Sequence, residues 1–275
     1  MNRLFVVDKP MFQSSNGYMR HIKRKYNSKK VGFSGTLDPF ATGCLIVAIG
    51  KYTKLFQYLK KTPKAYSATL WLGANSESLD IENITSIKET REFTIDEIYR
   101  ALESLRGEIS YYPPKFSAKK IDGKRAYELA RENRDVNLKK ITSTIYDIHL
   151  VHYNHPFIHF EVMVSEGAYI RSLGTMISDK LGVDATLSSL RRLYEGKFHY
   201  DKEKALDPLN FLKIPQNIYS GDIEYLKLGK KLSIDYFEKK DDGEYWVKGD
   251  EFFSVIEIRD GVVGYKLNRV PLYKG

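Results

Sequence analysis

The chain has 275 residues, 42% of them hydrophobic, which is enough for one large domain or for a main domain with a small appendage. Its longest strongly apolar run, Cys44 to Ile49, is too short to span a bilayer, and Met1 to Lys9 lacks the apolar stretch of a secretory signal. The single cysteine, Cys44, excludes an intramolecular disulfide and a cysteine-rich zinc site. We therefore expect a cytoplasmic protein that does not contact a membrane.

The formal net charge of +9 favours a polyanionic partner. An N-terminal block without an acidic residue carries Arg20, Lys23, Arg24, Lys25, Lys29 and Lys30. A second stretch carries Lys115, Lys119, Lys120, Lys124, Arg125, Arg131, Arg134, Lys139 and Lys140. Tyrosines accompany both stretches, and rings that stack on bases beside cations that pair with phosphates suit looped RNA. A solvated helical face is the alternative for each stretch, so charge alone leaves both open.

Strands and helices are predicted in the first half from hydrophobic periodicity. We expect a strand at Leu4–Val7, a helix from Ser14 or Ser15, a strand at Gly43–Ile49, a helix at Lys51–Lys60 and a strand at Ala65–Leu72. The clearest helix follows Thr94, because Thr94 and Glu97 form a capping box and Gly107 ends the helix. Its apolar stripe consists of Ile95, Ile98, Leu102 and Leu105.

The second half predicts strands at Ile141–Val151 and Phe157–Val164, a helix at Ile170–Leu181 and a shorter helix at Leu187–Leu193. These elements alternate without a regular βαβ rhythm, which favours a mixed α+β architecture over a doubly wound parallel sheet. From Leu226 onward, short alternating strands separated by turn residues indicate a small β appendage.

The chain lacks the familiar catalytic sequence motifs, and its most distinctive segment is the loop Gly35–Gly43. The chain has no P-loop, no GxGxxG, no HExxH and no nucleophile elbow. His149, His152, His155 and His159 could hold a metal, but exposed strand histidines are the favoured interpretation, because no Cys or acid cluster accompanies them. In Gly35–Gly43 (GTLDPFATG), terminal glycines and an Asp-Pro step predict a tight, rigid loop before a buried strand. The Asp-Pro dipeptide by itself is typical of an ordinary turn.

The segment VGFSGTLDPFATGCLIVAIGKYTK, residues 31–54, resembles the signature of TruB-type tRNA pseudouridine synthases. Further blocks match the family in its own order. These are KAY at 64–66 with LG at 72–73 and SLD at 78–80, PPKFSA at 113–118 with GKRAYELAR at 123–131, GAYIRSL at 167–173, and LRR at 190–192. The resemblance covers about residues 4–215.

The resemblance implies a mixed, largely antiparallel central sheet flanked by helices, the pseudouridine synthase fold. It implies a catalytic domain at 1–220, with an RNA-gripping insertion at about 113–140. The domain at 221–275 resembles a shortened PUA domain. The implied reaction is isomerisation of a T-loop uridine of tRNA, at position 55, to pseudouridine by base flipping, with no metal or other cofactor. The implied partner is the tRNA T arm.

The resemblance also assigns the site residues. Asp38 is the catalytic carboxylate, acting either by covalent attack or by removing a sugar proton. A buried carboxylate needs a cation to stay ionised, and the family places Arg171 there. Asp80 is the second acid that orients Arg171. Tyr66 stacks on the uracil and is a candidate for the late proton transfer, and Tyr169 lines the same pocket.

The implied RNA contacts are Phe33 together with Lys115, Lys119, Lys124, Arg125 and Arg131 of the insertion. The sequence departs from the family at three positions. Phe33 replaces a histidine thought to fill the space of the flipped base, and it can stack but cannot form a hydrogen bond. Phe12 replaces a glycine and Tyr111 replaces a glutamine, so the local loop geometry differs there.

Two other functions stay open at this stage. One is a non-catalytic RNA-binding or RNA-folding protein, against which intact Asp38, Tyr66 and Arg171 argue. The other is the RNA-guided branch that modifies ribosomal RNA within a particle, whose members normally carry a fuller PUA domain and terminal extensions. We expect the stand-alone bacterial type, a monomer without an obligatory protein partner.

Overall fold

A computed structural model describes residues 1–117, 120–121, 124–126 and 138–274. Its main feature is a nine-stranded sheet in which β1, β3, β12, β4, β11, β10 and β7 lie side by side in that order, with β2 beside β3 and β13 beside β12. The bounds are β1 (Arg3–Lys9), β2 (Val31–Ser34), β3 (Thr42–Ile49), β4 (Lys64–Leu72), β7 (Gly107–Tyr111), β10 (Ile141–Asn154), β11 (Phe157–Val164), β12 (Ala185–Glu195) and β13 (Phe198–His199). Only the β12–β3 pair is parallel among these ladders.

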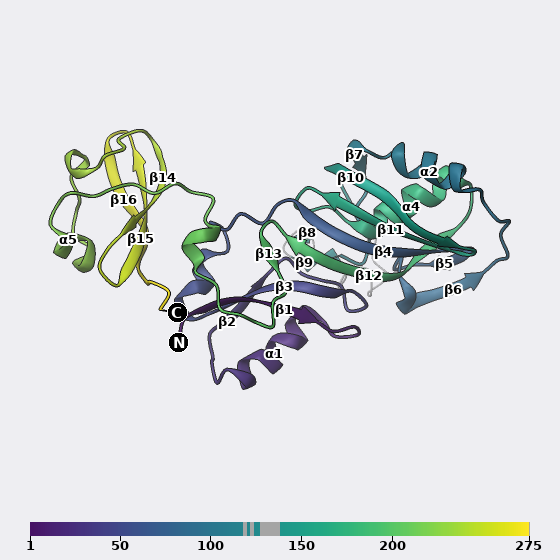
Figure 1. The fold of residues 1–275 in the computed structure, drawn as a ribbon, viewed down its shortest axis with the longest axis horizontal. Coiled ribbons are helices and arrows are strands. Elements are labelled where there is room, and N and C mark those ends of the chain that lie inside the picture. The colour runs from purple at the N-terminus through teal and green to yellow at the C-terminus, as the bar shows by residue number, and fades with distance from the viewer. Residues whose placement is uncertain (118–119, 122–123, 127–137, 275) are drawn as a thin grey trace.

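Among the described residues, three α-helices accompany this sheet: α1 (Ser15–Lys25), α2 (Ile95–Glu103) and α4 (Ile170–Leu181). Helices α2 and α4 pack on each other and on β10 and β12, whereas α1 contacts β2 near the opposite end of the sheet, as Figure 1 shows. The minor elements are η1 (Gly50–Leu55), β5 (Ala74–Ser76), η2 (Ile81–Asn83), β6 (Ile84–Ile87), β8 (Lys120–Ile121), β9 (Lys124–Arg125) and η3 (Pro208–Phe211). Within the described residues, none of the helices is long and apolar enough to cross a membrane.

The C-terminal part forms its own antiparallel sheet in the order β14, β15, β16. It contains α5 (Ile223–Leu228), η4 (Ile234–Tyr236), β14 (Gly243–Lys248), β15 (Phe252–Arg259) and β16 (Val262–Pro271). This sheet lies at one end of the molecule, and both termini lie close to its junction with the main sheet (Figure 1). The predicted fold class is therefore confirmed, while the PUA resemblance and the boundary near residue 220 stay predictions.

Two hydrophobic clusters lie on opposite faces of the β1–β3 end of the sheet. Phe5, Val7, Leu45 and Val47 join the cluster under α4, while Leu4, Val6, Cys44 and Ile46 join a second one. The second cluster also contains Phe253, Val255 and Val270 of the C-terminal sheet. A strand covered on both faces needs apolar residues at successive positions, which explains the uninterrupted run Cys44–Ile49.

The predicted helix at Leu187–Leu193 is wrong, because these residues belong to the central strand β12. A β-bulge between Leu187 and Ser189 adds one residue, so the buried Leu187 and Leu190 are three positions apart on one face. That spacing imitates a helical period. Burial between two neighbouring strands decides the structure here, against the local pattern.

The helix predicted at Lys51–Lys60 is shorter than expected. It is the 3-10 helix η1, and it ends at Leu55 because Lys60 donates its backbone N–H to Phe211 and Lys213 donates to Tyr58. The capping box of Thr94 and Glu97 is confirmed. Its stripe is correct for Ile98, Leu102 and Leu105, but Ile95 is exposed.

Candidate active site

The Asp38 loop runs from the end of β2 to the start of β3, and both of its terminal glycines have left-handed backbones. Gly35 has φ of +69° and Gly43 has φ of +102°. A side chain at Gly43 would collide with the backbone carbonyl of Arg192. Glycine is therefore required where the loop enters the sheet. The predicted tight loop is confirmed at both ends.

Two side chains, one from β1 and one from α1, form hydrogen bonds with the backbone of this loop. The buried hydroxyl of Ser15, at the start of α1, hydrogen-bonds both the N–H and the carbonyl of Leu37 at 3.0 Å. The ammonium of Lys9, fully buried at the end of β1, donates to the carbonyl of Pro39 at 3.2 Å. The backbone on either side of Asp38 is therefore anchored before any ligand arrives.

Arg171 projects from the first turn of α4 and binds the Asp38 carboxylate with two nitrogens. Its Nε lies 2.9 Å from Oδ2, and its Nη2 donates to Oδ1 at 3.0 Å. The remaining N–H groups donate to the carbonyls of Ser78 and Phe116, both at 2.7 Å. The contact at Nη2 is a hydrogen bond, whereas the contact at Nε is an ion pair without hydrogen-bond geometry, so one guanidinium edge contacts both carboxylate oxygens. The arginine is 3% exposed and its orientation is fixed on all sides.

Burial raises the pKa of Asp38 above that of a free aspartate, while the charge of Arg171 opposes this shift. The Asp38 side chain is still 32% exposed, so one part of it faces the pocket. Desolvation of a carboxylate makes it more basic and more reactive in its ionised form, provided that a cation keeps it ionised. Arg171 supplies that cation.

Asp80 lies behind Arg171, away from the pocket. Its Oδ2 is 3.5 Å from Arg171 Nη1, and its Oδ1 accepts hydrogen bonds from the Ser78 hydroxyl and from the N–H of Glu82. With these partners Asp80 caps η2 as well as contacting the arginine. The structure thus brings Asp80 to Arg171, as predicted, but not into the pocket lining.

The opposite wall of the pocket contains a second group of buried charges. Arg192 is paired across the strands with Tyr66, and its Nη2 lies 2.9 Å from Glu195. Lys64 reaches the same carboxylate at 3.0 Å. Burial is the largest influence on Arg192 and disfavours its charge, but Glu195, Tyr66 and Cys44 together outweigh burial and raise the arginine pKa.

Arg192 also grips the Asp38 loop at both ends. Its Nε donates to the carbonyl of Cys44, and its Nη2 donates to the carbonyl of Gly35, both at 2.8 Å. Sequence reasoning missed this role of Arg192 and also that of Glu195, although the motif at 190–192 was recognised. The pairing depends on the register of β12 against β3 and β4, which the motif does not reveal.

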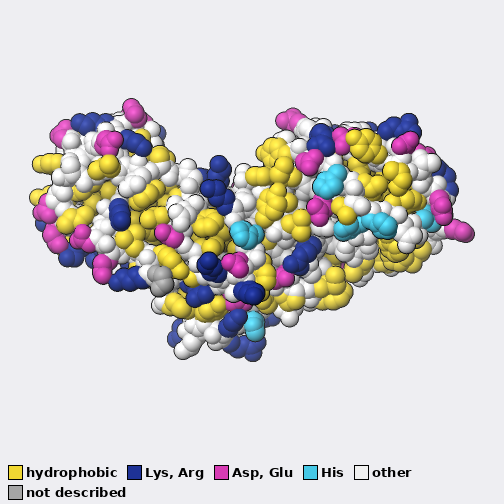
Figure 2. Space-filling view, viewed as in Figure 1, with side chains coloured by type: hydrophobic (Ala, Val, Ile, Leu, Met, Phe, Trp, Pro, Cys, Tyr) yellow, Lys and Arg dark blue, Asp and Glu magenta, His cyan; other side chains and the backbone are white. Residues whose placement is uncertain are grey.

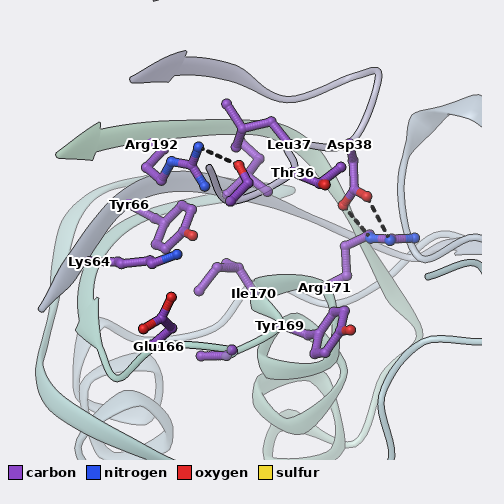
Figure 3. Close-up of a pocket in the computed structure, with 14 residues that line it drawn as sticks. Thr36, Leu37, Asp38, Lys64, Tyr66, Glu166, Tyr169, Ile170, Arg171 and Arg192 are labelled. Atoms are coloured by element: carbon purple, nitrogen blue, oxygen red, sulfur yellow. Dashed lines mark hydrogen bonds and ion pairs between the residues drawn. The ribbon is translucent and has the colours of Figure 1, made fainter. Parts of the chain in front are cut away.

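These residues enclose a pocket of about 280 Å³. Four of the predicted site residues line it: Asp38, Tyr66, Tyr169 and Arg171. Figure 3 shows Asp38 and Arg171 on one side, and Tyr66 and Lys64 on the other. Tyr169 caps α4 two residues before Arg171, and its backbone N–H is held by the hydroxyl of Tyr111 at 3.0 Å.

Of the predicted RNA contacts, Phe33 and Lys115 lie outside this pocket lining. Phe33 is partly buried in β2, where it packs against the main core. Lys115 is exposed, and the backbone of Lys124 and Arg125 forms β9, paired with β8. Lys119 and Arg131 lie outside the described residues.

The histidine region gives no support for a metal site. His159 is held between the hydroxyls of Ser67 and Thr69, at 3.1 and 2.9 Å from its two ring nitrogens. His149 and His152 are exposed on the sheet. Across the part of the chain that the structure describes, no group of three or more His, Cys, Asp or Glu side chains is placed to hold a metal ion.

Comparison with known proteins accounts for most of the chain. Residues 23–170 match the sequence model described as "TruB family pseudouridylate synthase (N terminal domain)". The chain belongs to the TruB family of pseudouridylate synthases. Family members named tRNA pseudouridine synthase B include one from Sulfurovum sp., 66% identical and covering 100% of this chain and 99% of its own length. Another from Sulfurimonas denitrificans is 51% identical, covering 98% of this chain and 99% of its own.

Solved structures with the same fold are more distant in sequence. A chain of a Cbf5–Nop10–Gar1 complex aligns with a TM-score of 0.67 at 22% identity, over 99% of this chain and 85% of that one. A chain of an H/ACA RNP bound to a substrate RNA aligns with a TM-score of 0.64 at 20% identity, over 99% and 85%. These likenesses confirm the pseudouridine synthase fold. Family membership makes the chain an isomerase that forms pseudouridine.

Proposed function

We propose that the chain converts one uridine in the T loop of tRNA, position 55, to pseudouridine, with Asp38 as the catalytic carboxylate. Two observations support the substrate. The relatives that match it over nearly their full length are named tRNA pseudouridine synthases, and the sequence motifs resemble that family in order and spacing. The observation that supports the role of Asp38 is its side-on ion pair with Arg171 in the wall of the pocket.

Asp38 acts on the sugar of a uridine that has left its stack. The base–sugar bond to N1 breaks, the uracil turns, and the sugar carbon rejoins the base at C5. The carboxylate either attacks the sugar carbon and is later displaced, or removes a sugar proton and returns it. Both routes require an ionised carboxylate, which the two-nitrogen contact with Arg171 favours against the effect of burial.

Tyr66 contacts the uracil during this turn. Its ring is 7% exposed and forms part of the pocket wall, so a base entering the pocket has an aromatic surface to stack on. We propose its hydroxyl as the group for the final proton transfer from C5, and the position of Tyr66 in the pocket wall, across the strands from Arg192, supports this role. Tyr169 lines the same pocket beside Arg171.

The RNA grip lies in the segment 113–140. Flipping a base costs a few kcal/mol, and contacts to the RNA backbone must offset that cost. The segment starts at the active site, because the carbonyl of Phe116 accepts from Arg171 and the carbonyl of Tyr112 accepts from Ser172 at 3.1 Å. We propose that Lys115, Lys119, Lys124, Arg125 and Arg131 hold the T arm, and that Phe33 contacts the RNA near the flipped base.

Under this proposal, the chain works in the cytoplasm as a stand-alone monomeric enzyme, without a metal or other cofactor. The isomerisation changes neither the redox state nor the atom count of the uridine, so it needs no co-reactant. An RNA-guided role within a particle is the alternative. The full-length likeness to bacterial enzymes that are named for tRNA favours the stand-alone type.

The test uses an unmodified T-arm stem-loop that carries a single candidate uridine. Pseudouridine is mapped by chemical adduct formation and primer extension, with wild-type enzyme and with Asp38→Asn. We expect full conversion by the wild type and no product with Asp38→Asn, which preserves the size of the side chain and removes its charge. Absence of product with wild-type enzyme contradicts the substrate, and undiminished product with Asp38→Asn contradicts the role of Asp38.

A further inference from the structure

The turn between β1 and α1 presents a large aromatic side chain to solvent. Phe12 is 66% exposed, and its backbone has φ of +59°, in the left-handed region. A bulky residue there is an outlier, because its Cβ crowds the following carbonyl, whereas glycine adopts this conformation freely. An exposed ring also buries little apolar area. Neither packing nor backbone geometry therefore accounts for a phenylalanine at this position.

The same turn is rigidly joined to the Asp38 loop. The buried ammonium of Lys9 donates to the carbonyl of Pro10 at 2.7 Å and to that of Gln13 at 2.6 Å, on either side of Phe12. Its third hydrogen bond goes to Pro39, directly after Asp38. One side chain thus fixes the turn and the loop to each other, and Phe12 keeps a defined place relative to the Asp38 loop.

The helix that follows this turn has the charge of an RNA-binding surface. Arg20, Lys23 and Arg24 of α1 are exposed, and within the described residues none of them forms an ion pair. Residues 9–37 contain no acidic side chain. Figure 2 shows dark-blue side chains gathered at the position of α1, along the lower edge of the molecule. An exposed ring followed by unpaired cations complements a nucleotide strand, with its base faces and its phosphates.

We propose that Phe12 stacks on an unpaired base of the RNA substrate next to the target uridine, while Arg20, Lys23 and Arg24 hold the adjoining backbone. This inference rests on the proposed function and adds a second RNA contact on the side of the site formed by α1. Under this proposal the left-handed backbone at Phe12 lowers the stability of the fold, and phenylalanine is retained there because its ring binds RNA. Phe12 is a binding residue and takes no part in the chemistry.

The test separates RNA affinity from fold stability. Phe12→Gly, Phe12→Tyr and the control Tyr99→Ala are each made in the Asp38→Asn background, so that turnover does not interfere. Tyr99 is a comparably exposed aromatic residue, 54% exposed, on α2. Dissociation constants for the T-arm stem-loop are measured by fluorescence anisotropy, and melting temperatures are measured by calorimetry.

We expect Phe12→Gly to weaken RNA binding about tenfold, the loss typical of one stacked base. Its melting temperature stays the same or rises, because glycine relieves the left-handed backbone. Phe12→Tyr and Tyr99→Ala keep the affinity of the Asp38→Asn parent. Unchanged affinity of Phe12→Gly overturns the inference, and this result would leave a protein partner as the reason for the exposed ring. A markedly lower melting temperature of Phe12→Gly also overturns it, by making Phe12 a structural residue.

The assay for pseudouridine keeps this inference distinct from the proposed function. If the wild type forms no pseudouridine in the stem-loop, the proposed function fails first. If the wild type modifies the RNA and Phe12→Gly binds equally well, only the Phe12 contact fails.

The contribution of α1 is tested separately. Arg20→Gln combined with Arg24→Gln should flatten the dependence of log Kd on log salt, and an unchanged slope would remove α1 from the RNA contact.

Discussion

The two walls of the pocket are built alike but serve different ends. Each contains an almost fully buried arginine bound to a carboxylate: Arg171 with Asp38 and Arg192 with Glu195. Asp38 is 32% exposed and faces the pocket, whereas Glu195 is completely buried and also binds Lys64. The first pair offers its carboxylate to a substrate. In the Arg192–Glu195 pair the carboxylate is inaccessible to substrate, and the remaining donors of Arg192 form hydrogen bonds with the backbone of the Asp38 loop.

This difference shows how a reactive carboxylate is kept in place. Burying an ion pair costs desolvation energy that the mutual attraction recovers only with good geometry and further hydrogen bonds. Around Arg192 those bonds go to the carbonyls of Gly35 and Cys44, so the buried pair defines the ends of the loop. Around Arg171 they go to Ser78 and Phe116, outside the loop, and Arg171 fixes the middle of the loop through its pair with Asp38.

The largest effect on stability is expected from breaking the buried pair at Arg192. Arg192→Met leaves Glu195 buried with Lys64 as its single ion-pair partner among the described residues, and should lower the free energy of unfolding by about 3–5 kcal/mol. Arg191→Met is the matched control. The neighbouring Arg191 forms an exposed pair with Asp8, worth less than about 1 kcal/mol. Urea unfolding measures both, and equal losses would contradict the distinction between the two arginines.

The next largest effect concerns turnover. Arg171→Ala should lower kcat about 100- to 1000-fold, because it removes a fixed cation from the reacting centre, and should change the Kd for RNA little. Arg171→Lys should recover little of that loss, since an ammonium cannot bind the carboxylate side-on. Single-turnover kinetics and anisotropy with the stem-loop separate the two quantities. A parallel loss of affinity would instead assign Arg171 to the RNA grip.

The sequence predicted one wall of the pocket and not the other, for a physical reason. Asp38, Tyr66 and Arg171 lie in family motifs from which their chemical roles can be inferred. The glycines of the Asp38 loop predict the tight turns at its two ends. Arg192 lies in a motif too, but its function depends on contacts with Gly35, Cys44 and Glu195, which only the strand register creates. The same register was hidden by the bulge at Leu187, which made β12 resemble a helix.

Several strands followed from the hydrophobic pattern, since β4 and β11 alternate between the core and the other face while β1 and β3 are continuous buried runs. The short strands β2 and β7 were not predicted. The error at η1 arose because Tyr58 and Lys60 form backbone hydrogen bonds with the distant segment at Phe211 and Lys213, which end the helix early. Lys9 could not be recognised either. A lysine after a buried strand is normally solvated, and only the closed loop around it shows three carbonyls converging on its ammonium.

Lys9 extends the comparison to a buried cation that has no carboxylate in direct contact among the described residues. Desolvation lowers its pKa from 10.5 to about 8, and the more distant Asp38 opposes this shift. The charged form therefore costs stability at neutral pH, although its hydrogen bonds hold the Asp38 loop. Between about pH 8 and 10.5 the unfolded chain binds this proton and the folded chain does not, so stability rises with pH in that window.

Lys9→Met isolates this contribution, because all other titrating groups are shared with the wild type. The difference in unfolding free energy between wild type and Lys9→Met should stay constant below about pH 8. Above that pH it should shift in favour of the wild type by about 1.4 kcal/mol per pH unit, until the unfolded lysine also loses its proton near pH 10.5. Urea unfolding at pH 7, 8, 9 and 10 measures it. A difference that stays flat across this range would mean that Lys9 keeps an ordinary pKa, with Asp38 close enough to act as its counter-ion, as Glu195 does for Arg192.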